Sequence, residues 1–571
     1  MSSEITGTLV IFFLTVILAY PLGKYISKVF KNEKTFTDFL NPVERFIFKV
    51  SGINPNESMD WKQFLKAMLT VNMLWLVYAF VLLIFQDKLP LNPDGNAGQS
   101  PDLAFNTAIS FLVNCNLQHY SGESGFTYFT QLFVVTFLQF LSAATGIACL
   151  IALLNGLKEK TTTNLGNFWN YLVKSVTRIL LPLSIIVAII LAFNGTPASY
   201  DGKDTITTLQ GDTVQVSRGP AAGMIAIKQL GTNGGGWFGV NSAHPFENPN
   251  YITNAVETIA ILLIPIALVF TLGFYLNRKK LAWMIFGVMT FLFVIFSATN
   301  IYFETKGNPA INKLGIAQTT GSMEGKEMRI GSAATALWSV ATTSTSNGSV
   351  NGMHDSLTPM SGAIVLLDMM INALYGGVGV GLLNFFIFII VAVFISGLMV
   401  GRTPEFMGHK VEAREIKIAA LITLLSAFII KGFTAFAAYM VAHHPEMAWA
   451  VKPSAWLNNP SYHGFSEMLY EYTSANANNG SGFEGLADNN VFWNITTGIA
   501  LILGRYLPII GPIAIVGLLA KKKFIPESPG TLRTDSGTFG VMILAVIIIV
   551  TALSYLPPLV LGPLAEFFSL Y

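Results

Sequence analysis

The feature that most constrains this chain is a series of apolar stretches, each long enough to cross a lipid bilayer. A helix needs about 20 predominantly apolar residues to span the hydrocarbon core of a membrane. Ten stretches meet this requirement. Their approximate bounds are 5–29, 65–86, 128–156, 171–194, 252–277, 282–302, 371–400, 417–443, 491–519 and 539–566. The sequence therefore predicts an all-α polytopic membrane protein with about ten transmembrane helices.

The composition agrees with this interpretation. Charged residues make up 12% of the 571 residues and hydrophobic residues 52%, whereas charged residues are roughly 25% of soluble domains. No polar stretch is large enough for a separate soluble domain, so we interpret 1–571 as a single membrane domain surrounded by lipid. The net charge is only +2, and no basic run lies outside the membrane flanks. Binding to nucleic acid is therefore not expected.

Four short stretches of small and amide residues interrupt the apolar sequence. They are 113–118, 230–236, 345–349 and 476–481. Each follows about ten residues of helix-like pattern, lies between two long apolar spans, and comes about 115 to 130 residues after the one before. Irregular backbone is tolerated at membrane depth only where it is buried in protein or lines a water-filled path. The recurrence predicts one loop design used four times around an axis.

The first and last spans stand outside this recurrence, and the other eight pair around the four loops. We predict four pseudo-symmetric helix–pore loop–helix repeats with one extra helix at each end. The predicted segments are 1–64 for the extra amino-terminal helix and a cytoplasmic loop, then 65–156, 171–277, 282–400 and 417–519 for the repeats, and 539–571 for the extra carboxy-terminal helix. The repeats share little sequence identity, so this division follows from the order of the spans and from the small and amide residues that all four loops contain.

The basic residues predict the orientation. Most lysines and arginines outside the spans fall within 24–66, 158–178, 278–280, 402–417 and 521–533, and such loops normally face the cytoplasm. We expect the protein in the bacterial cytoplasmic (inner) membrane, with both termini and all four pore loops on its outer side. The repeats are then parallel, unlike the inverted repeats of many secondary transporters.

The four loops have the chemistry of a monovalent cation filter. A bare K⁺ ion needs a ring of oxygens in place of its water shell. Backbone carbonyls form such a ring where residues adopt unusual dihedrals, as glycine does readily and asparagine tolerates. The candidate filter residues are Asn114, Cys115, Asn116, Thr232, Asn233, Gly234, Ser346, Asn347, Gly348, Asn478, Asn479 and Gly480, with Gln118 flanking the first loop. No acidic residue lies within the loops. Any one of these stretches alone is also a common turn; the fourfold recurrence favours the filter.

Charges and glycines inside the spans suggest a barrier or gate. Arg505 falls near the middle of the ninth span, where a positive charge would hinder K⁺ from running on to the cytoplasm; a buried salt bridge is the alternative. Lys431 in the eighth span is a second candidate, although it could also snorkel or pair with a carbonyl. Gly377 and Gly379 belong to a glycine run at the start of the seventh span. That run is either a helix break that gates the pore or a site of close helix packing.

Four carboxylates follow the filter loops by a few residues each. Glu123, Glu247, Asp355 and Glu484 could form an electronegative vestibule that concentrates cations, or they could anchor the loops. The histidines His119, His244 and His354 lie near the same mouth. Their spacing suits no metal site, and we interpret them as loop-packing or hydrogen-bonding residues.

Several longer motifs resemble one transporter family. They are Ile227-Lys228-Gln229-Leu230-Gly231-Thr232-Asn233-Gly234-Gly235-Gly236, Asn241-Ser242-Ala243-His244-Pro245-Phe246-Glu247-Asn248-Pro249, Val350-Asn351-Gly352-Met353-His354-Asp355-Ser356, Gly401-Arg402-Thr403-Pro404-Glu405 and Tyr472-Thr473-Ser474-Ala475-Asn476. These strings look like the potassium-binding A subunit of the bacterial Kdp potassium-transporting P-type ATPase. The similarity extends over nearly the whole chain.

The resemblance implies a function and a set of partners. Such a subunit takes K⁺ from outside through its filter and passes it laterally to an ATP-hydrolysing B subunit, with small C and F subunits in the complex. The family's filter positions carry over to the candidate residues above, and Gln118 matches a flanking glutamine. Two departures stand out: Cys115-Asn116-Leu117 replaces an expected Thr-Asn-Trp, and Asn347 stands where a cysteine is common.

The chain is not expected to hydrolyse ATP itself. It contains no Asp-Lys-Thr-Gly-Thr phosphorylation motif and no Walker loop. We therefore expect a non-catalytic subunit with no cofactor of its own. K⁺ would be the transported ion, and the partner subunit would use ATP and Mg²⁺.

Two other functions remain open. The first is an autonomous, channel-like K⁺ uptake protein driven by membrane potential, which the longer motifs disfavour. The second is a non-conducting membrane scaffold, which the polar character of all four loops disfavours.

Overall fold

The computed structural model describes residues 2–401, 403–449, 451–526 and 533–570. Arg402, which belongs to one of the motifs quoted above, lies outside these residues. The main helices of the ten apolar spans are α1 (Ser2–Phe30), α3 (Trp61–Ile84), α6 (Phe137–Lys158), α8 (Leu181–Phe193), α10 (Tyr251–Tyr275), α11 (Lys279–Lys306), α15 (Val380–Val400), α16 (Ala413–His443), α18 (Val491–Leu519) and α19 (Gly537–Leu559). The other helices are α2 (Asn41–Ser51), α4 (Pro101–Leu112), α5 (Gly122–Gly125), α7 (Phe168–Lys174), α9 (Ala221–Leu230), α12 (Pro309–Lys313), α13 (Ser332–Ser344), α14 (Pro359–Ile371), α17 (Ser461–Ala477) and α20 (Ala565–Leu570).

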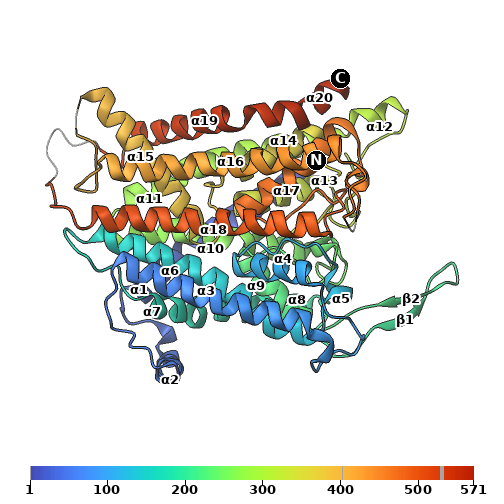
Figure 1. Cartoon of the computed structure of the whole chain (residues 1–571), viewed down its shortest axis with the longest axis horizontal. Coiled ribbons are helices and arrows are strands. Elements are labelled where there is room, and N and C mark those ends of the chain that lie inside the picture. Colours follow the sequence, from blue (N-terminus) through green and yellow to red (C-terminus); the bar gives the residue numbers. More distant parts are fainter. Residues whose placement is uncertain (1, 402, 450, 527–532, 571) are drawn as a thin grey trace.

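Ten segments of the described chain are long and apolar enough to cross a membrane, as the sequence predicts. Several continue through π-helical turns, for example α7 through Ser175–Leu180 into α8, and α19 through Val560–Leu564 into α20. These segments run side by side in one bundle (Figure 1). The protein is therefore an all-α multi-pass membrane protein.

The seventh span differs from its predicted bounds of 371–400. The helix that enters from the filter end, α14, stops at Ile371, and α15 begins only at Val380. Between them Asn372, Tyr375, Gly376 and Gly379 all have positive φ angles, which a continuing α-helix does not allow. The crossing thus consists of two helices joined by an irregular loop. The glycine run both breaks the helix and, at Gly379, packs closely against α6.

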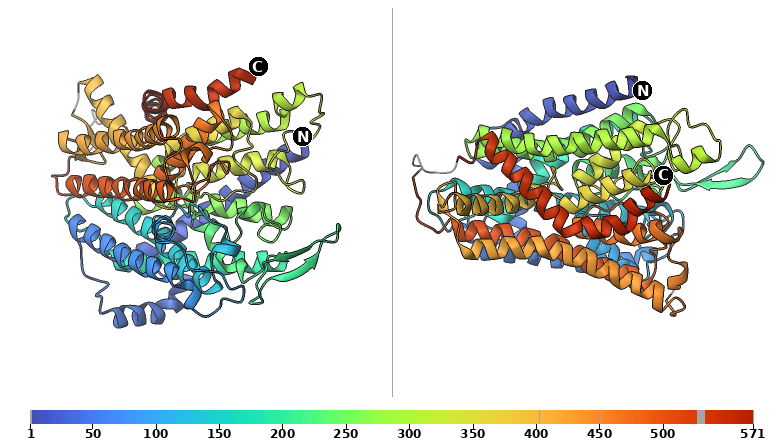
Figure 2. Two further views of the ribbon diagram at one scale, coloured as in Figure 1. Left: turned by 45° about the vertical axis from the view of Figure 1, so that its right-hand side comes forward. Right: turned by 90° about the horizontal axis from the view of Figure 1, so that it is seen from above.

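Both further views show the long helices running in roughly one direction (Figure 2), and four units of the same order follow one another between the two extra helices. Each has an outer helix, a short pore helix, a loop, and an inner helix. The units are α3–α4–α6, α8–α9–α10, α11–α13–α14/α15 and α16–α17–α18. The two extra helices pack outside: α1 lies along α10, where Thr271 donates a 3.2 Å hydrogen bond to the Gly23 carbonyl. This is the predicted fold class of four repeats with an extra helix at each end.

The two ends of the bundle differ. Both termini and the antiparallel hairpin of β1 (Asp204–Thr207) and β2 (Thr213–Val216) lie at the end where the pore loops open (Figure 1). We call this the filter end. The short pair of β3 (Glu405–Phe406) and β4 (His409–Lys410) belongs to the opposite end, together with most of the lysines and arginines, and we call that the basic end.

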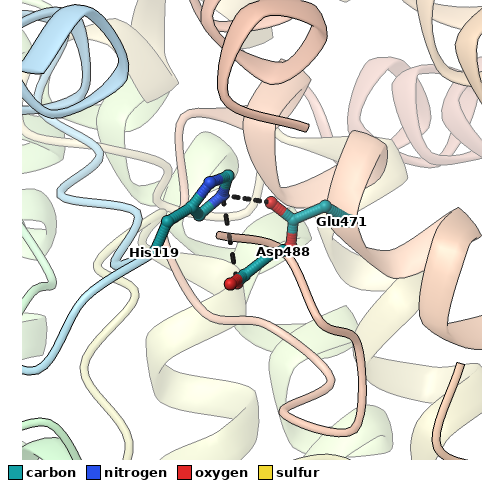
Figure 3. A group of neighbouring side chains, drawn as sticks. All are labelled: His119, Glu471 and Asp488. Carbon is teal, nitrogen blue, oxygen red and sulfur yellow. Dashed lines mark hydrogen bonds and ion pairs between the residues drawn. The ribbon is translucent and has the colours of Figure 1, made fainter. Parts of the chain in front are cut away.

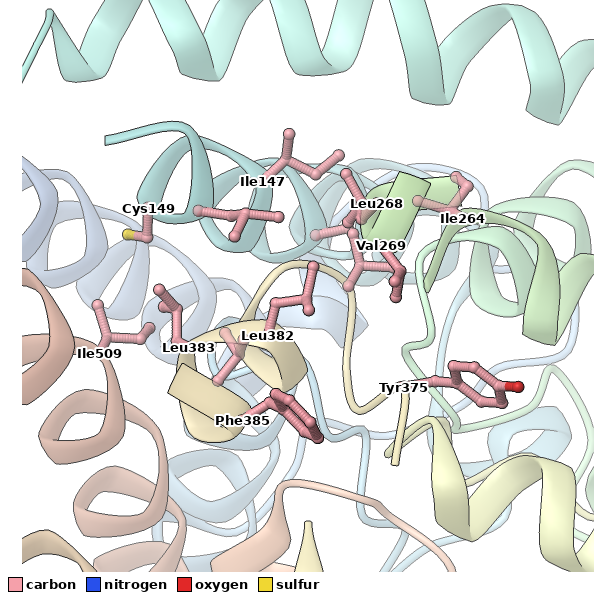
Figure 4. Close-up of a cluster of buried hydrophobic side chains, with 14 of the residues drawn as sticks. Ile147, Cys149, Ile264, Leu268, Val269, Tyr375, Leu382, Leu383, Phe385 and Ile509 are labelled. Atoms are coloured by element: carbon pink, nitrogen blue, oxygen red, sulfur yellow. The ribbon is translucent and has the colours of Figure 1, made fainter. Parts of the chain in front are cut away.

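Apolar side chains from all four inner helices meet on the basic side of the filter (Figure 4). They include Ile147 from α6, Leu268 from α10, Leu383 from α15 and Ile509 from α18, none of which is more than 1% exposed. Because these four helices belong to four different repeats, the core of the molecule lies on the axis itself.

Candidate functional site: a ring of four pore loops

Each pore loop begins where a short buried helix ends. α4, α9, α13 and α17 end at Leu112, Leu230, Ser344 and Ala477. The first and third helices stop just before their stretches, and the other two end within the first two residues of theirs. All four helices point their carboxyl ends toward the loops, so their partial negative charges converge there. The sequence predicts about ten residues of helix-like pattern before each stretch. In the structure these residues form the four short helices that lead into the loops, which we call pore helices.

The four loops share one backbone pattern. In each, two residues separated by one have positive φ angles: Asn114 and Asn116, Thr232 and Gly234, Ser346 and Gly348, Asn478 and Gly480. Positive φ is rare for a residue with a side chain and is most unusual for a β-branched one such as threonine. The alternation turns successive carbonyls toward the same side. This repeat of dihedral angles establishes the equivalence of the loops more firmly than their sequence identity does.

The loops also touch one another in cyclic order. A Cβ atom added to the glycine of one loop would collide with the middle carbonyl oxygen of the next. The pairs are Gly234 with Asn347, Gly348 with Asn479, and Gly480 with Cys115. Gly235 packs against Asn116 and closes the ring between the second and first loops. The twelve predicted filter residues thus lie in one closed ring, and its three glycines leave no room for a side chain.

Asparagine amides tie each loop to its neighbour. Asn233 donates to the Asn114 Oδ1 atom (2.8 Å), Asn347 to the carbonyls of Lys228 and Gln229 (3.3 Å each), and Asn479 to the Thr342 carbonyl (2.8 Å). Cys115 occupies the corresponding position in the first loop. Its thiol cannot donate and accept hydrogen bonds as an amide does. The two departures from the family pattern therefore differ: the Asn347 side chain links its loop to the neighbouring one, and the Cys115 side chain does not.

A buried lysine supports the second loop from behind. Lys228, in α9, is 0% exposed and forms an ion pair with Glu247, which is also 0% exposed. Its ammonium group further donates to Asn241 Oδ1 (2.7 Å) and Ser242 Oγ (2.9 Å). The sequence leaves two roles open for Glu247, a vestibule charge or a loop anchor. The structure contradicts the vestibule role, because a buried lysine on the preceding pore helix takes up its charge.

The other three predicted carboxylates lie closer to the mouth. Glu123 accepts from the Gly239 backbone N–H (2.6 Å), and Asp355 accepts from His463 (2.9 Å). Glu484 lines a cavity of about 410 Å³ directly beyond the ring. Two further acids, Glu471 and Asp488, line the same cavity. Sequence reasoning missed both, since Glu471 lies inside a pore helix and becomes part of the mouth only through folding.

Gln118, predicted to flank the filter, also joins the first two loops. Its Oε1 atom accepts from the Gly236 backbone N–H and from Asn241, both at 2.9 Å. The side chain therefore holds the mouth side of the second loop in register with the first.

The irregular segment of the seventh span lies directly under the ring. The Val378 N–H donates to Thr232 Oγ1 (2.9 Å), and Gly376 N–H donates to the Ser344 carbonyl (2.8 Å). Gly377 lies next to Ser346 and Thr232. Gly379 abuts Gly146 of α6, so a side chain fits at neither glycine of this contact. Both predicted gate glycines are thus located between the filter and the apolar core.

Arg505 lies at the same level. It is 3% exposed and donates to the Ser142 carbonyl (3.0 Å), and its guanidinium approaches Gly146. In the described part of the chain, no carboxylate forms an ion pair with Arg505. The alternative role that the sequence allowed, a buried salt bridge, is therefore not observed among these residues. Lys431, the second candidate barrier, lies instead on an exposed face of α16. That placement removes Lys431 from the pore.

One histidine of the mouth joins two repeats (Figure 3). His119 of the first repeat contacts Glu471 Oε1 at 3.0 Å and Asp488 Oδ2 at 3.9 Å, and its Nδ1 lies 2.7 Å from Asn494 Oδ1. The Asn494 amide nitrogen donates to Asp102, so its oxygen must face the imidazole. Both ring nitrogens therefore donate. The group resembles a candidate metal site by geometry, but a doubly protonated imidazole binds no metal, which agrees with the hydrogen-bonding role predicted for this histidine.

The His119 cluster predicts a pH dependence of stability. Burial alone would lower the pKa of His119, but Asp488 and Glu471 outweigh it and raise the pKa from 6.5 to about 9. The contribution of the charged His119 to stability is then complete below pH of about 6.5 and is lost as the pH rises through about 9. We expect the melting temperature of the purified protein to fall over this range. In His119→Gln the free energy of unfolding should fall less steeply with pH than in the wild type. The two slopes should differ by up to about 1.4 kcal/mol per pH unit.

The control for this experiment is His463, another histidine held between two carboxylates. His463 lies between Asp355 and Glu566, and these carboxylates raise its pKa to about 10 against the opposing effect of burial. His463→Gln should therefore flatten the profile at a higher pH than His119→Gln does. Identical profiles for the wild type and His119→Gln would contradict a charged His119.

Comparison with known proteins places these features in one family. The family model for the potassium-transporting ATPase A subunit matches residues 9–568. The chain is 62% identical over 573 residues to the potassium-transporting ATPase potassium-binding subunit of Flavobacterium psychrophilum, covering 100% of both chains. It is 45% identical to the subunit of the same name from Geobacillus kaustophilus, covering 98% of each. Among solved structures, the potassium transporter TrkH from Vibrio parahaemolyticus matches with a TM-score of 0.53 at 12% identity, over 90% of this chain and 98% of that one. This last similarity shows the fold.

Proposed function

Because the chain belongs to the family of potassium-transporting ATPase A subunits, we propose that it is the potassium-binding and selectivity subunit of an ATP-driven, high-affinity K⁺ uptake complex. K⁺ enters the ring of the four pore loops from the outside and is passed to an ATP-hydrolysing partner. The observation that carries this proposal is the closed ring itself: four loops with the same alternation of positive φ angles, held in cyclic contact.

The ring suits a dehydrated monovalent cation. The middle carbonyls of Cys115, Asn347 and Asn479 each abut the next loop, so their oxygens cannot move apart to suit another ion without disturbing their neighbours. Neutral carbonyl oxygens replace the hydration shell of K⁺. The filter lacks carboxylates, which a divalent ion would favour. In the mouth, the two carboxylates Glu471 and Asp488 face the single positive charge of His119, and the remaining negative charge attracts cations toward the ring.

The proposal includes a lateral exit. On the axis, the irregular segment with Gly377 and Gly379 and the charge of Arg505 lie at one level below the filter, and the apolar core follows them. Each opposes the passage of a bare ion. Beside the helix break lies a cavity of about 50 Å³ whose lining includes Asn372, Asn384 and Asn476. Amide oxygens are suitable K⁺ ligands, and we propose this cavity as the start of the path to the partner.

The rest of the assignment follows the family and the positive-inside rule. We propose that the filter end and both termini face the outside of the bacterial inner membrane, since most lysines and arginines are at the basic end. The partners are the ATP-hydrolysing B subunit, which uses ATP and Mg²⁺, and the smaller C and F subunits. This chain contributes ion selection and no ATP hydrolysis.

The test is the K⁺ dependence of ATPase activity in the co-purified complex carrying Gly234→Asp. Gly234 has φ of +101°, and a Cβ there would collide with the carbonyls of Cys115 and Asn347. We expect the K⁺ concentration for half-maximal activity to rise at least about 100-fold, equivalent to about 2.7 kcal/mol, with activity still reached at high K⁺. The matched control is Gly223→Asp in α9, where a Cβ meets no atom within 4 Å, and it should keep the wild-type affinity.

Two results would contradict the proposal. An unchanged K⁺ affinity and ion preference in Gly234→Asp would exclude the second loop from the filter. If no ATPase co-purifies while the chain alone carries K⁺ into liposomes, the autonomous channel-like function replaces the one proposed.

A further inference from the structure

One helix of the basic end lies across the direction of the others. α2 is seen nearly end-on in Figure 1, at the edge of the bundle, whereas the spanning helices run along the picture. It follows directly on a 3₁₀ turn, Phe36–Leu40, and both come after α1. A helix perpendicular to the spans and at their end lies parallel to the membrane surface.

The residues of α2 divide into three faces. Glu44 and Phe48 are 4% and 9% exposed and pack on the protein. A second face is apolar and exposed: Val43 49%, Phe46 66%, Ile47 37% and Val50 72%. These positions follow the i, i+3, i+4, i+7 spacing of a single helical stripe. Phe36 and Phe39 of the preceding turn, 76% and 71% exposed, add two more large apolar side chains.

The third face is basic. Arg45 and Lys49 are exposed and one helical turn apart. In the described part of the chain, no carboxylate forms an ion pair with either of them. An amphipathic helix with an exposed apolar stripe flanked by free cations is typical of an element that lies at the boundary between headgroups and acyl chains.

Arg178 holds α2 against a membrane-spanning segment. Its guanidinium donates to both carboxylate oxygens of Glu44 (2.5 and 2.7 Å), to Asp38 (2.9 Å) and to Asn41 (2.6 Å). Arg178 belongs to the span Phe168–Phe193, ten residues or roughly 15 Å from its basic end. The clamp therefore attaches α2 beside a membrane-spanning segment and not above the bundle.

Neighbouring surfaces show what covers the stripe. α1 and α8 both expose large apolar side chains along their spans, including Phe13 and Ile17 of α1 and Ile185 and Ile189 of α8. Such faces contact lipid. The stripe on α2 continues this lipid-facing surface at its basic end, and the free charges of Arg45 and Lys49 complement acidic headgroups.

We propose that the segment 36–51 is an in-plane membrane anchor that binds acidic phospholipid in the leaflet at the basic end. Its apolar stripe enters the acyl region, and Arg45 and Lys49 bind phosphate-bearing anionic headgroups. The occupant is the lipid surface, and the site is separate from the K⁺ ring.

The first test measures the depth of α2 in the complete complex, reconstituted in vesicles of phosphatidylcholine and phosphatidylglycerol. Val50→Cys and Lys49→Cys are each labelled with a small fluorophore; the native Cys115 and Cys149 are buried and should not react. A spin label on the acyl chain near the headgroup should quench the Val50 site at least twofold more than the Lys49 site. Aqueous iodide should quench in the opposite order. Shielding of the Val50 site from both quenchers would show that a protein partner covers it and would overturn the proposal.

The second test measures the choice of lipid. Arg45→Gln/Lys49→Gln should retain at least threefold less phosphatidylglycerol than the wild type, relative to phosphatidylcholine, as counted by native mass spectrometry of the complex. The charge-conserving variant Arg45→Lys/Lys49→Arg should retain the wild-type amount. Equal retention in all three would overturn the role of these two cations.

Discussion

Replacing Arg505 by leucine should let K⁺ cross the membrane through this chain without ATP. Among the described residues, Arg505 is the one positive charge between the pore ring and the apolar core. Leucine removes this charge and fills the same buried space. We expect passive K⁺ flux into liposomes that contain the complex, in the absence of ATP, to exceed that of the wild type by at least tenfold. ATP-driven accumulation of K⁺ should fall accordingly, because the ions leak back.

The physical reason is electrostatic. Arg505 is buried, forms no ion pair with a described carboxylate, and is hydrogen-bonded to the Ser142 carbonyl. Its charge is therefore not neutralised locally. Two like charges about 8 Å apart repel by roughly 2 kcal/mol at an effective dielectric constant of about 20. Because about 1.4 kcal/mol corresponds to a tenfold change in rate, removing this repulsion should speed the passage of K⁺ at least tenfold.

Arg505→Lys is the matched control, since it keeps the charge and changes the shape. It should leak much less than Arg505→Leu. If the two variants leak equally, the barrier is steric and not electrostatic. If neither leaks, the irregular segment at Gly377 and Gly379 together with the apolar core closes the axis without help from Arg505.

Replacing Lys228 by methionine should strongly destabilise the protein and weaken its filter. The lysine is fully buried in an ion pair with Glu247, and Glu257 lies in the same hydrogen-bond network through Ser242. Methionine fits the space but leaves buried carboxylates without a cation. Breaking a buried ion pair on one side costs about 3–5 kcal/mol, so we expect a clear fall in the melting temperature and in the yield of folded protein.

The effect should reach the filter through the backbone of α9. The Lys228 carbonyl accepts hydrogen bonds from the Asn233 N–H and from the Asn347 side chain, so a shifted α9 moves two loops at once. The measurements are thermal unfolding of the purified complex and the K⁺ dependence of its ATPase activity. The double variant Lys228→Met/Glu247→Gln removes the uncompensated charge and should recover part of the stability. No recovery would mean that the loss comes from packing and not from the unpaired carboxylate.

The spans and pore loops could be predicted because their signals are local. An apolar stretch of about 20 residues crosses a membrane whatever its neighbours are. Positive φ angles occur at the three predicted loop glycines and, in the first loop, at Asn114 and Asn116, because these residue types tolerate them best. The positive φ angles of Thr232 and Ser346 could not be predicted, because hydroxyl-bearing residues rarely adopt this conformation and only the ring of loops holds them in it.

The breaks and networks could not be predicted in the same way. The glycine run at Gly376–Gly381 has the hydropathy of a helix, and only its contacts with Ser344, Thr232 and Gly146 hold it in an irregular conformation. α2 was counted simply as part of a cytoplasmic loop. Its amphipathic pattern is visible in the sequence, but its position beside the membrane depends on Arg178, which is more than 130 residues away.

By itself, then, the sequence determined the membrane class, the number of spans, the four pore loops and the family, since hydropathy and backbone freedom are properties of short segments. Only the tertiary structure decided the role of each charge. Glu247 and Lys228 neutralise each other in the protein interior, Lys431 lies on the outside of the bundle, and Arg505 lies buried under the ring. The effect of a charge in a membrane protein depends on its distance from other charges and from water, and folding alone sets those distances.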